Sequence, residues 1–215
     1  MAQIFPKWTN SLPGKIALSG GILVILLVAG IWYYWSPWFT DVGYAPQQPV
    51  PYSHKLHVGE LGLDCRYCHV GVEVSPVAMV PPTQTCMNCH TLIKPESEKL
   101  APVRESWEKG TPLRWVRIHK VPDYAYFDHS AHLRAGVGCE SCHGDVAAME
   151  VVSLDQPLSM GWCLDCHRNP DPHLRPKEAI TVMGWVPPDD QPARAAAIKS
   201  SLKLNPPETC SGCHR

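Results

Sequence analysis

The sequence has few of the features from which a protein builds an apolar interior. Beyond its first 40 residues it has no long apolar run, and the alternation of apolar and polar residues typical of strands is scarce. Proline occurs 22 times in 215 residues, and it limits helices and sheets because it lacks a backbone donor. Such a chain would bury too little apolar surface by itself. We therefore expect something other than side chains to fill its interior.

Acidic residues are absent from the first 40 positions, where the only charges are Lys7 and Lys15. Residues 16–35 are an uncharged run of 20 residues, long enough to span a hydrocarbon core of about 30 Å. The two preceding lysines favour a cytoplasmic N-terminus. A cleaved signal peptide is the alternative. Against it, bulky aromatic residues occupy the place of a small-residue cleavage site: Trp32, Tyr33, Tyr34, Trp35 and Trp38.

These features predict a single-pass protein of the bacterial inner membrane. We expect residues 1–15 in the cytoplasm, 16–35 as a transmembrane helix and 36–51 as a proline-rich linker. Residues 52–215 would then form one periplasmic domain.

No cysteine is left over when the ten are paired by spacing. In each pair two residues separate the cysteines, and a histidine follows the second one directly. The cysteine pairs are Cys65 and Cys68, Cys86 and Cys89, Cys139 and Cys142, Cys163 and Cys166, and Cys210 and Cys213. The histidines that follow them are His69, His90, His143, His167 and His214.

The Cys-x-x-Cys-His spacing suits covalent attachment of haem. Two thiols at this spacing can form thioether links to the two vinyl groups of one haem, and the adjacent histidine becomes the proximal iron ligand. The sequence therefore predicts five haem c groups.

The part of the chain beyond residue 40 has 17 basic and 20 acidic residues. Five haems would add roughly two propionates each, which makes this part distinctly acidic. We expect basic docking surfaces on its partners and no affinity for nucleic acid.

Three other interpretations of the cysteines fit less well. Two pairs of motifs have the spacing of four-cysteine zinc ribbons, but zinc does not explain the five histidines and leaves Cys210 and Cys213 without partners. A disulfide across two residues stabilises little and is more typical of redox-active sites. A dithiol array lacks the thioredoxin-like βαβ pattern.

The chain contains an internal duplication. Each copy has an aromatic residue, a His-x-x-His pair, a haem motif, a spacer and a second haem motif, and the copies occupy residues 52–90 and 127–167. Residues 192–215 add a terminal haem motif outside the duplication. We also expect helices over 95–109, with Pro102 able to kink the first of them, and over 192–204. The predicted fold is a multihaem cytochrome c, mostly coil with short α-helices packed around haems.

Six histidines outside the motifs are candidates for the distal side of the irons. We predict distal ligation by the two His-x-x-His pairs and by a histidine in an aromatic segment ahead of the second unit. His173 is the spare, and Met149 is the preferred methionine alternative, ahead of Met79 and Met160. Because ligands outnumber irons, we expect no open catalytic iron. The predicted distal ligands are His54, His57, His119, His129 and His132.

Several long strings resemble the pentahaem cytochrome subunit of alternative complex III, a bacterial quinol:electron-acceptor oxidoreductase. They are IFPKWTN with the apolar run, YSHKLH with CRYCH, PPTQTCMNCH, HKVPDYAYFDHSAH with CESCHG, MEVV and PLSMGWCLDCHRNP, and PPETCSGCHR. The resemblance covers most of the chain. It implies a row of closely spaced haems in a membrane-bound respiratory or photosynthetic complex.

The same resemblance implies three kinds of partner and a direction of electron flow. The partners would be an iron–sulfur subunit related to molybdopterin oxidoreductases, polytopic quinol-binding subunits and a monohaem cytochrome c. Electrons would pass from quinol to a downstream cytochrome or other acceptor, and the chain itself would be non-catalytic. A stand-alone quinol dehydrogenase that feeds a periplasmic reductase is the alternative hypothesis, and a multihaem reductase is a weaker one.

Overall fold

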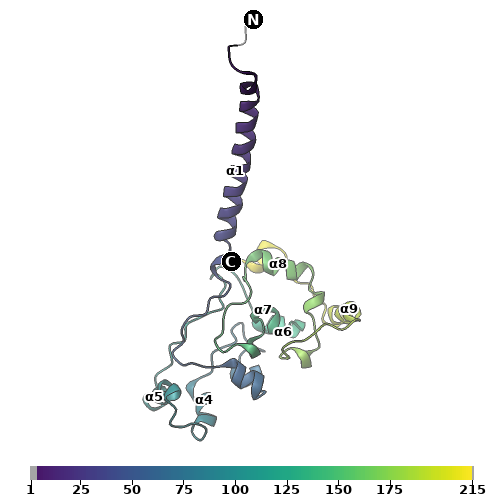
Figure 1. Cartoon of the computed structure of the whole chain (residues 1–215). Helices are drawn as coiled ribbons and strands as arrows, with labels where there is room; N and C mark the ends of the chain where they lie inside the picture. The colour runs from purple at the N-terminus through teal and green to yellow at the C-terminus, as the bar shows by residue number, and fades with distance from the viewer. Residues whose placement is uncertain (1–3, 215) are drawn as a thin grey trace. The chain divides into compact units, whose positions relative to one another are not determined.

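The computed structural model describes residues 4–214 and divides the chain into two compact units, Met1–Asp41 and Val42–Arg215. Figure 1 shows short helices joined by long irregular segments. The described residues form no strand, only two isolated bridges that join Ala125 to His214 and Val137 to Leu174. The predicted architecture of coil and short helices is confirmed.

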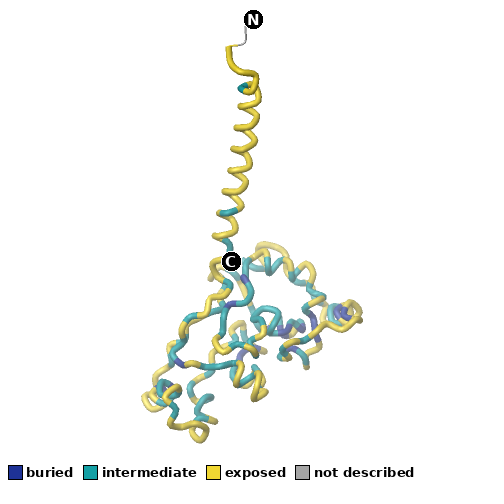
Figure 2. The backbone as a smooth tube through the Cα atoms, viewed as in Figure 1, coloured by how far each residue is buried: buried dark blue, intermediate teal, exposed yellow. Residues whose placement is uncertain are grey.

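The first unit consists of one long helix between two short ones. Its elements are η1 (Lys7–Ser11), α1 (Leu12–Tyr34) and α2 (Pro37–Thr40). The 23 residues of α1 correspond to about 35 Å at 1.5 Å per residue, and none of them is buried, as Figure 2 shows. Among residues 4–214, this is the helix that is long and apolar enough to cross a membrane. Both a membrane anchor and an export signal have this character.

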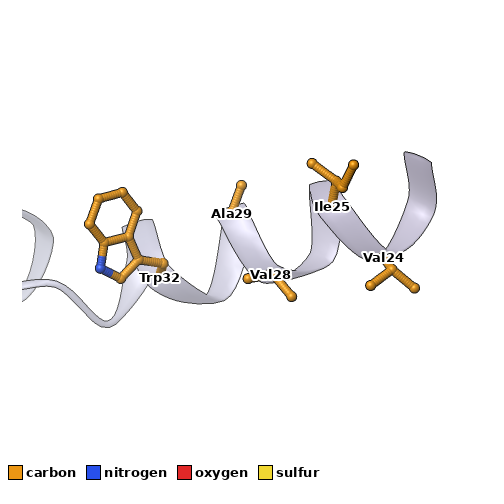
Figure 3. A pocket seen from close by; sticks show the side chains of 5 residues that line it. All are labelled: Val24, Ile25, Val28, Ala29 and Trp32. Carbon is orange, nitrogen blue, oxygen red and sulfur yellow. The ribbon is translucent and has the colours of Figure 1, made fainter. Parts of the chain in front are cut away.

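One side of α1 carries a shallow hollow without polar atoms suited to a ligand. Figure 3 shows its side chains, which all come from this helix: Val24, Ile25, Val28, Ala29 and Trp32. A surface of this kind suits lipid tails or a neighbouring apolar helix. It holds no candidate cofactor ligand.

The second unit is built from helices of at most 12 residues. Several begin and end at residues with clear capping roles. Asp128 accepts hydrogen bonds from the backbone of Ser130 and Ala131 at the start of one helix, and Gly136 ends that helix with a φ of 92°. In chain order the elements are η2 (Lys55–Glu60), α3 (Cys65–Cys68), α4 (Thr83–His90), η3 (Glu98–Leu100), α5 (Ala101–Lys109), α6 (His129–Ala135), α7 (Glu140–His143), η4 (Val146–Ala148), α8 (Met160–Arg168), η5 (Asp171–His173), η6 (Lys177–Ala179), α9 (Gln191–Leu202) and α10 (Cys210–Cys213).

Both helices predicted outside the haem motifs are present, with shifted ends. The helix expected over 95–109 begins as α5 at Ala101, so Pro102 lies in its first turn and does not kink it. Gly110 ends it with a φ of 62°. The helix expected over 192–204 is α9, which ends two residues early because Lys203 adopts the left-handed conformation, with a φ of 51°.

The apolar core of the second unit is small. One cluster joins Val72, Leu133 and Ile180, with Cys139 packed against it. Many large apolar side chains remain exposed, including Leu92 and Val186, and buried segments are scattered along the tube in Figure 2. The sequence-based expectation that side chains alone do not fill the interior agrees with this core. The buried apolar residues among those described are Val50, Val72, Val103, Leu133, Leu154, Leu174, Ile180 and Ala195.

Candidate haem-binding site

Each of the five Cys-x-x-Cys-His motifs lies on or at the start of a helix, namely α3, α4, α7, α8 and α10. Residues three apart share one face of a helix, so both thiols of a motif are presented together. All ten cysteines are free of disulfides. The described residues contain no group of three or more His, Cys, Asp or Glu side chains placed to hold a metal ion. The structure therefore gives no support to the zinc and disulfide interpretations.

The cysteines of the first two motifs lie close to cysteines of other motifs. Burial raises the pKa of Cys68, and the neighbouring thiol of Cys86 raises it further. Cys65 and Cys139 lie close together, and their interaction lowers the pKa of Cys65 and raises the pKa of Cys139. The first motif therefore lies near both the second and the third.

Cysteines of the later motifs also influence one another electrostatically. Burial raises the pKa of Cys142 to about 12, with further contributions from Cys166 and Cys163. Burial and then the neighbouring Cys213 raise the pKa of Cys163. Taken together, these electrostatic effects indicate the spatial order two, one, three, four, five. Figure 1 agrees, since α4 lies at one end of the second unit, α7 in the middle and α8 beyond it.

The exposure of the cysteines to solvent follows the spatial order of the five motifs. Cys89 and Cys210 are the two cysteines classed as exposed, and the other eight are partly buried. These two belong to the second and fifth motifs, which are the two ends of the array. The central motif is the most enclosed, and burial lowers the pKa of its His143 to about 3, with smaller effects from His119 and His129.

Six histidines are held in one tautomer by the backbone. In each, Nδ1 lies 2.7–2.9 Å from a carbonyl oxygen. When Nδ1 donates that hydrogen bond, Nε2 keeps its lone pair and is free to bind a metal, which is the usual arrangement around histidine ligands. The six pairs are His57 with Ser53, His69 with Met79, His90 with Ile93, His129 with Pro76, His132 with Asp128, and His167 with Pro207.

The distances between histidine rings test whether two of them could share an iron. Imidazole nitrogens bind metal ions at about 2.0–2.1 Å, so two rings on opposite sides of one iron would have centres about 6 Å apart. The ring centres of His57 and His90 are 6.2 Å apart, and those of His132 and His167 are also 6.2 Å apart. The centres of His129 and His143 are 6.3 Å apart. All three pairs fit a shared haem iron.

Two further candidates, His54 and His119, lie near the central motifs. Burial lowers the pKa of each to about 4, so both are neutral near pH 7. His54 Nδ1 and His119 Nε2 are buried without a hydrogen-bond partner, as expected of nitrogens whose partner is a cofactor. After burial, the largest electrostatic effect on the pKa of His54 comes from His69, which lowers it. The ring centres of His119 and His143 are 4.2 Å apart. This separation is too short for the two rings to bind opposite sides of one iron.

The duplication in the sequence is repeated in the geometry. Tyr52 meets His54 edge-on at 4.8 Å and stacks on His57 at 4.4 Å. Phe127 has the same relationships with His129, at 4.7 Å, and with His132, at 4.8 Å. One difference is that the first pair lies at the start of a π-helix, η2, and the second in the α-helix α6. The aromatic residue fixes the orientation of both histidines in each copy.

The alternate ligands named from the sequence have different surroundings from one another. The carbonyl of Met149 accepts a hydrogen bond from the backbone of Lys55, and Met160 is exposed in the first turn of α8. Burial and then Arg175 lower the pKa of His173. No ring contact joins His173 to another histidine in residues 4–214.

A buried ion pair beside the third motif was not anticipated from the sequence. Arg175 Nη2 lies 2.9 Å from Glu140 Oε1, and the two side chains are 3% and 16% exposed. Glu140 also accepts hydrogen bonds from the backbone of Gly184 and Trp185, and the guanidinium lies 4.6 Å from the centre of the Trp185 ring. These contacts fix the segment after the fourth motif against the helix of the third. An arginine between prolines in the sequence gives no signal of this role.

Residues 125–215 match the family described as "Cytochrome c7 and related cytochrome c". The chain has a multihaem fold like that of cytochrome c7. This cytochrome is also 29% identical, over 181 residues, to the menaquinone reductase multihaem cytochrome c subunit of Nitratidesulfovibrio vulgaris. The match covers 73% of the cytochrome and 85% of that protein.

The residues present fit covalently bound haem. The cytochrome has paired free thiols, an adjacent histidine in every pair, histidines fixed with Nε2 free, and a small core. One-electron oxidation and reduction of iron is the chemistry that each haem supplies when bound. The protein attaches the haems, fixes the imidazoles and sets how far each site is exposed to water.

Proposed function

We propose that this cytochrome is an electron-transfer subunit with five covalently bound haems, attached at the ten cysteines listed above. The single observation that carries the proposal is the set of three histidine pairs whose ring centres lie 6.2–6.3 Å apart, each pair joining a motif to a His-x-x-His pair. The electrostatic influence of the cysteines of one motif on those of the next supports a single row of haems. The ends of that row would be the motifs of Cys89 and Cys210.

We assign the axial pairs by distance and by the repeat. In each copy the first histidine of the pair would serve the first motif, as His129 does for His143, and the second histidine would serve the second motif. By the same rule His54 would serve His69. The assignments supported by ring distances are His57 with His90, His129 with His143 and His132 with His167.

The first unit supports membrane attachment. Under this proposal α1 anchors the chain in the inner membrane with the haem domain on the outside, where haem is attached covalently to exported chains. The relative from N. vulgaris is named as a subunit of a menaquinone reductase, which supports a working partnership with membrane proteins that handle quinone. An iron–sulfur subunit, polytopic quinol-binding subunits and a monohaem cytochrome c, as in alternative complex III, are the partners we propose.

Purification in mild detergent tests this function. We expect five haems for each chain by pyridine haemochrome assay, partner subunits that contain iron–sulfur clusters and several membrane spans, and quinol oxidation by the complex. The isolated full chain should accept electrons from a chemical reductant but should not oxidise quinol. Quinol oxidation by the isolated chain would instead establish the stand-alone quinol dehydrogenase.

The direction of electron flow is a separate question. Quinol oxidation is the direction proposed here, whereas the name of the relative indicates quinone reduction. Assaying the complex with quinol plus an oxidised cytochrome, and with quinone plus a reduced cytochrome, compares the two directions. A faster quinone reaction would reverse the proposed direction without changing the haem row.

A further inference from the structure

The distribution of histidines over the five motifs is uneven. The pairs within the two copies place His57 beside His90, His132 beside His167 and His129 beside His143. His54 lies near His69, and His119 lies 4.2 Å from His143. Five of the six histidines outside the motifs are therefore gathered at the first four motifs.

The sixth histidine, His173, is also remote from the fifth motif. It lies in η5, beside Arg175. Arg175 is bound to Glu140 at the start of α7, and η5 is fixed to α9 by the ion pair of Asp171 with Lys199 and by hydrogen bonds from Gln191. These contacts hold His173 on the side of the third motif.

The fifth motif lies near the end of α8, through His167 with Pro207 and Arg168 with Glu208, and against a second short segment. Ala125 forms an isolated bridge with His214, and the backbone of Tyr126 donates to the carbonyl of Cys213 at 2.7 Å. The ring in contact with His214 is that of Tyr124, at 5.8 Å. Within residues 4–214, no histidine ring is in contact with His214. Cys210 is exposed, so water reaches this end of the array.

We propose that the haem attached at Cys210 and Cys213 has no histidine on its distal side, and that its iron is open to a small diatomic ligand such as carbon monoxide. This inference rests on the proposed attachment of haem at the fifth motif. It differs from the expectation based on ligand numbers, because the surplus histidines lie near the central motifs and not at the end. The site would be a ligand-binding iron at the exposed end of an otherwise six-coordinate row.

Met160 is the side chain that could take the distal position instead. It lies one turn before Cys163 on the same helix, and Cys163 neighbours Cys213. Its side chain is exposed and 64% accessible, and no contact directs it toward His214. A variant at this residue therefore belongs in the test.

Carbon monoxide binding to the purified, reduced full chain tests the proposal. Difference spectra should show binding at one iron in five, with a matching loss of one high-spin signal. Cys210→Ser/Cys213→Ser should retain four haems and lose the carbon monoxide signal. Met160→Leu should bind carbon monoxide as the unmodified chain does.

Three results would overturn the proposal: no binding by the unmodified chain, binding that persists in the double serine variant, or binding that appears only in Met160→Leu. The haem count, measured on the same samples, keeps this test separate from the proposed function. Five haems with no carbon monoxide binding would reject the open iron and leave the electron-transfer row intact. Fewer than five haems in the unmodified chain would reject the row itself.

Discussion

The imidazole rings of His132 and His167 lie with their centres 6.2 Å apart. Each Nδ1 is within 2.7 Å of a backbone carbonyl oxygen, so each Nε2 is available to a metal. The two residues come from different helices, α6 and α8. Their separation and tautomers make this pair the best-defined candidate for two ligands of one iron.

Replacing His132 with methionine should change one haem out of five. A methionine ligand raises the potential of a haem compared with histidine. We expect that one component of a potentiometric titration moves upward by on the order of 0.1 V, a part of the roughly 0.8 V range over which axial ligands act. His173→Met is the matched control and should leave all five components in place. Equal shifts in both variants would remove His132 from the ligand set.

The central motif should be essential for passage along the row. Cys139→Ser/Cys142→Ser removes the link between the first motif and the fourth, so we expect electron exchange between the two ends to slow at least about 10-fold because the gap widens. Stopped-flow spectra of the full chain, mixed with a substoichiometric reductant, follow this exchange. Cys210→Ser/Cys213→Ser also removes one haem but should leave exchange among the other four unchanged. Equal slowing of electron exchange in both variants would contradict the proposed spatial order of the five motifs.

Breaking the buried pair of Arg175 and Glu140 should destabilise the second unit strongly. Arg175→Met leaves Glu140 charged and mostly enclosed, which costs about 3–5 kcal/mol in comparable sites. Denaturant unfolding of the haem-loaded chain measures the loss. Arg194→Met, which breaks the exposed pair with Asp190, should leave the unfolding curve almost unchanged, because water screens exposed charges. Adding Glu140→Gln to Arg175→Met should recover part of the loss, because no unpaired charge then remains.

Asp64 should contribute to stability in a pH-dependent way. Its hydrogen bond with Arg66 is the main cause that lowers its pKa from 3.8 to about 2, and it also caps α3. Its contribution is therefore fully present above the unfolded pKa of 3.8 and is lost as pH falls through about 2. Asp64→Ala should cost about 1 kcal/mol at pH 7, typical of a lost helix cap. This cost should shrink steadily below pH 4.

The control for Asp64 is Asp189→Ala. Asp189 is exposed and makes no side-chain hydrogen bond or ion pair within the described part of the chain. Unfolding curves at several pH values should coincide with those of the unmodified chain. A cost for Asp64→Ala that did not change with pH would show that the carboxylate charge is unimportant there.

Sequence alone predicted the short-helix fold, the apolar helix and most of the histidines that gather near the motifs. The His-x-x-His pairs were informative because an aromatic residue and a haem motif follow a fixed order in both copies. The sequence could not tell which histidine meets which motif, because that depends on long-range folding. One example is the hydrogen bond of His129 Nδ1 to Pro76 O, which joins residues 53 positions apart.

The contacts of Arg175 and the crowding of His119 were beyond sequence reasoning for a similar reason. Arg175 lies in a proline-rich segment that resembles an exposed loop, yet its side chain is 3% exposed. His119 was predicted to be a distal ligand, and the 4.2 Å separation of its ring centre from that of His143 is a result of tertiary packing. The number of histidines in a sequence predicts how many irons can have two axial ligands. It does not predict where those histidines lie in the fold.

The small apolar core has a consequence for how long the protein survives in the cell before haem is attached. Eight buried apolar side chains among those described provide little free energy to offset the entropy lost on folding. A group that binds only the folded state stabilises it by mass action, and covalent haem makes that stabilisation permanent. We therefore expect the newly exported chain to be degraded by proteases until its haems are attached. The supply of haem would then control the abundance of the protein without a separate regulator.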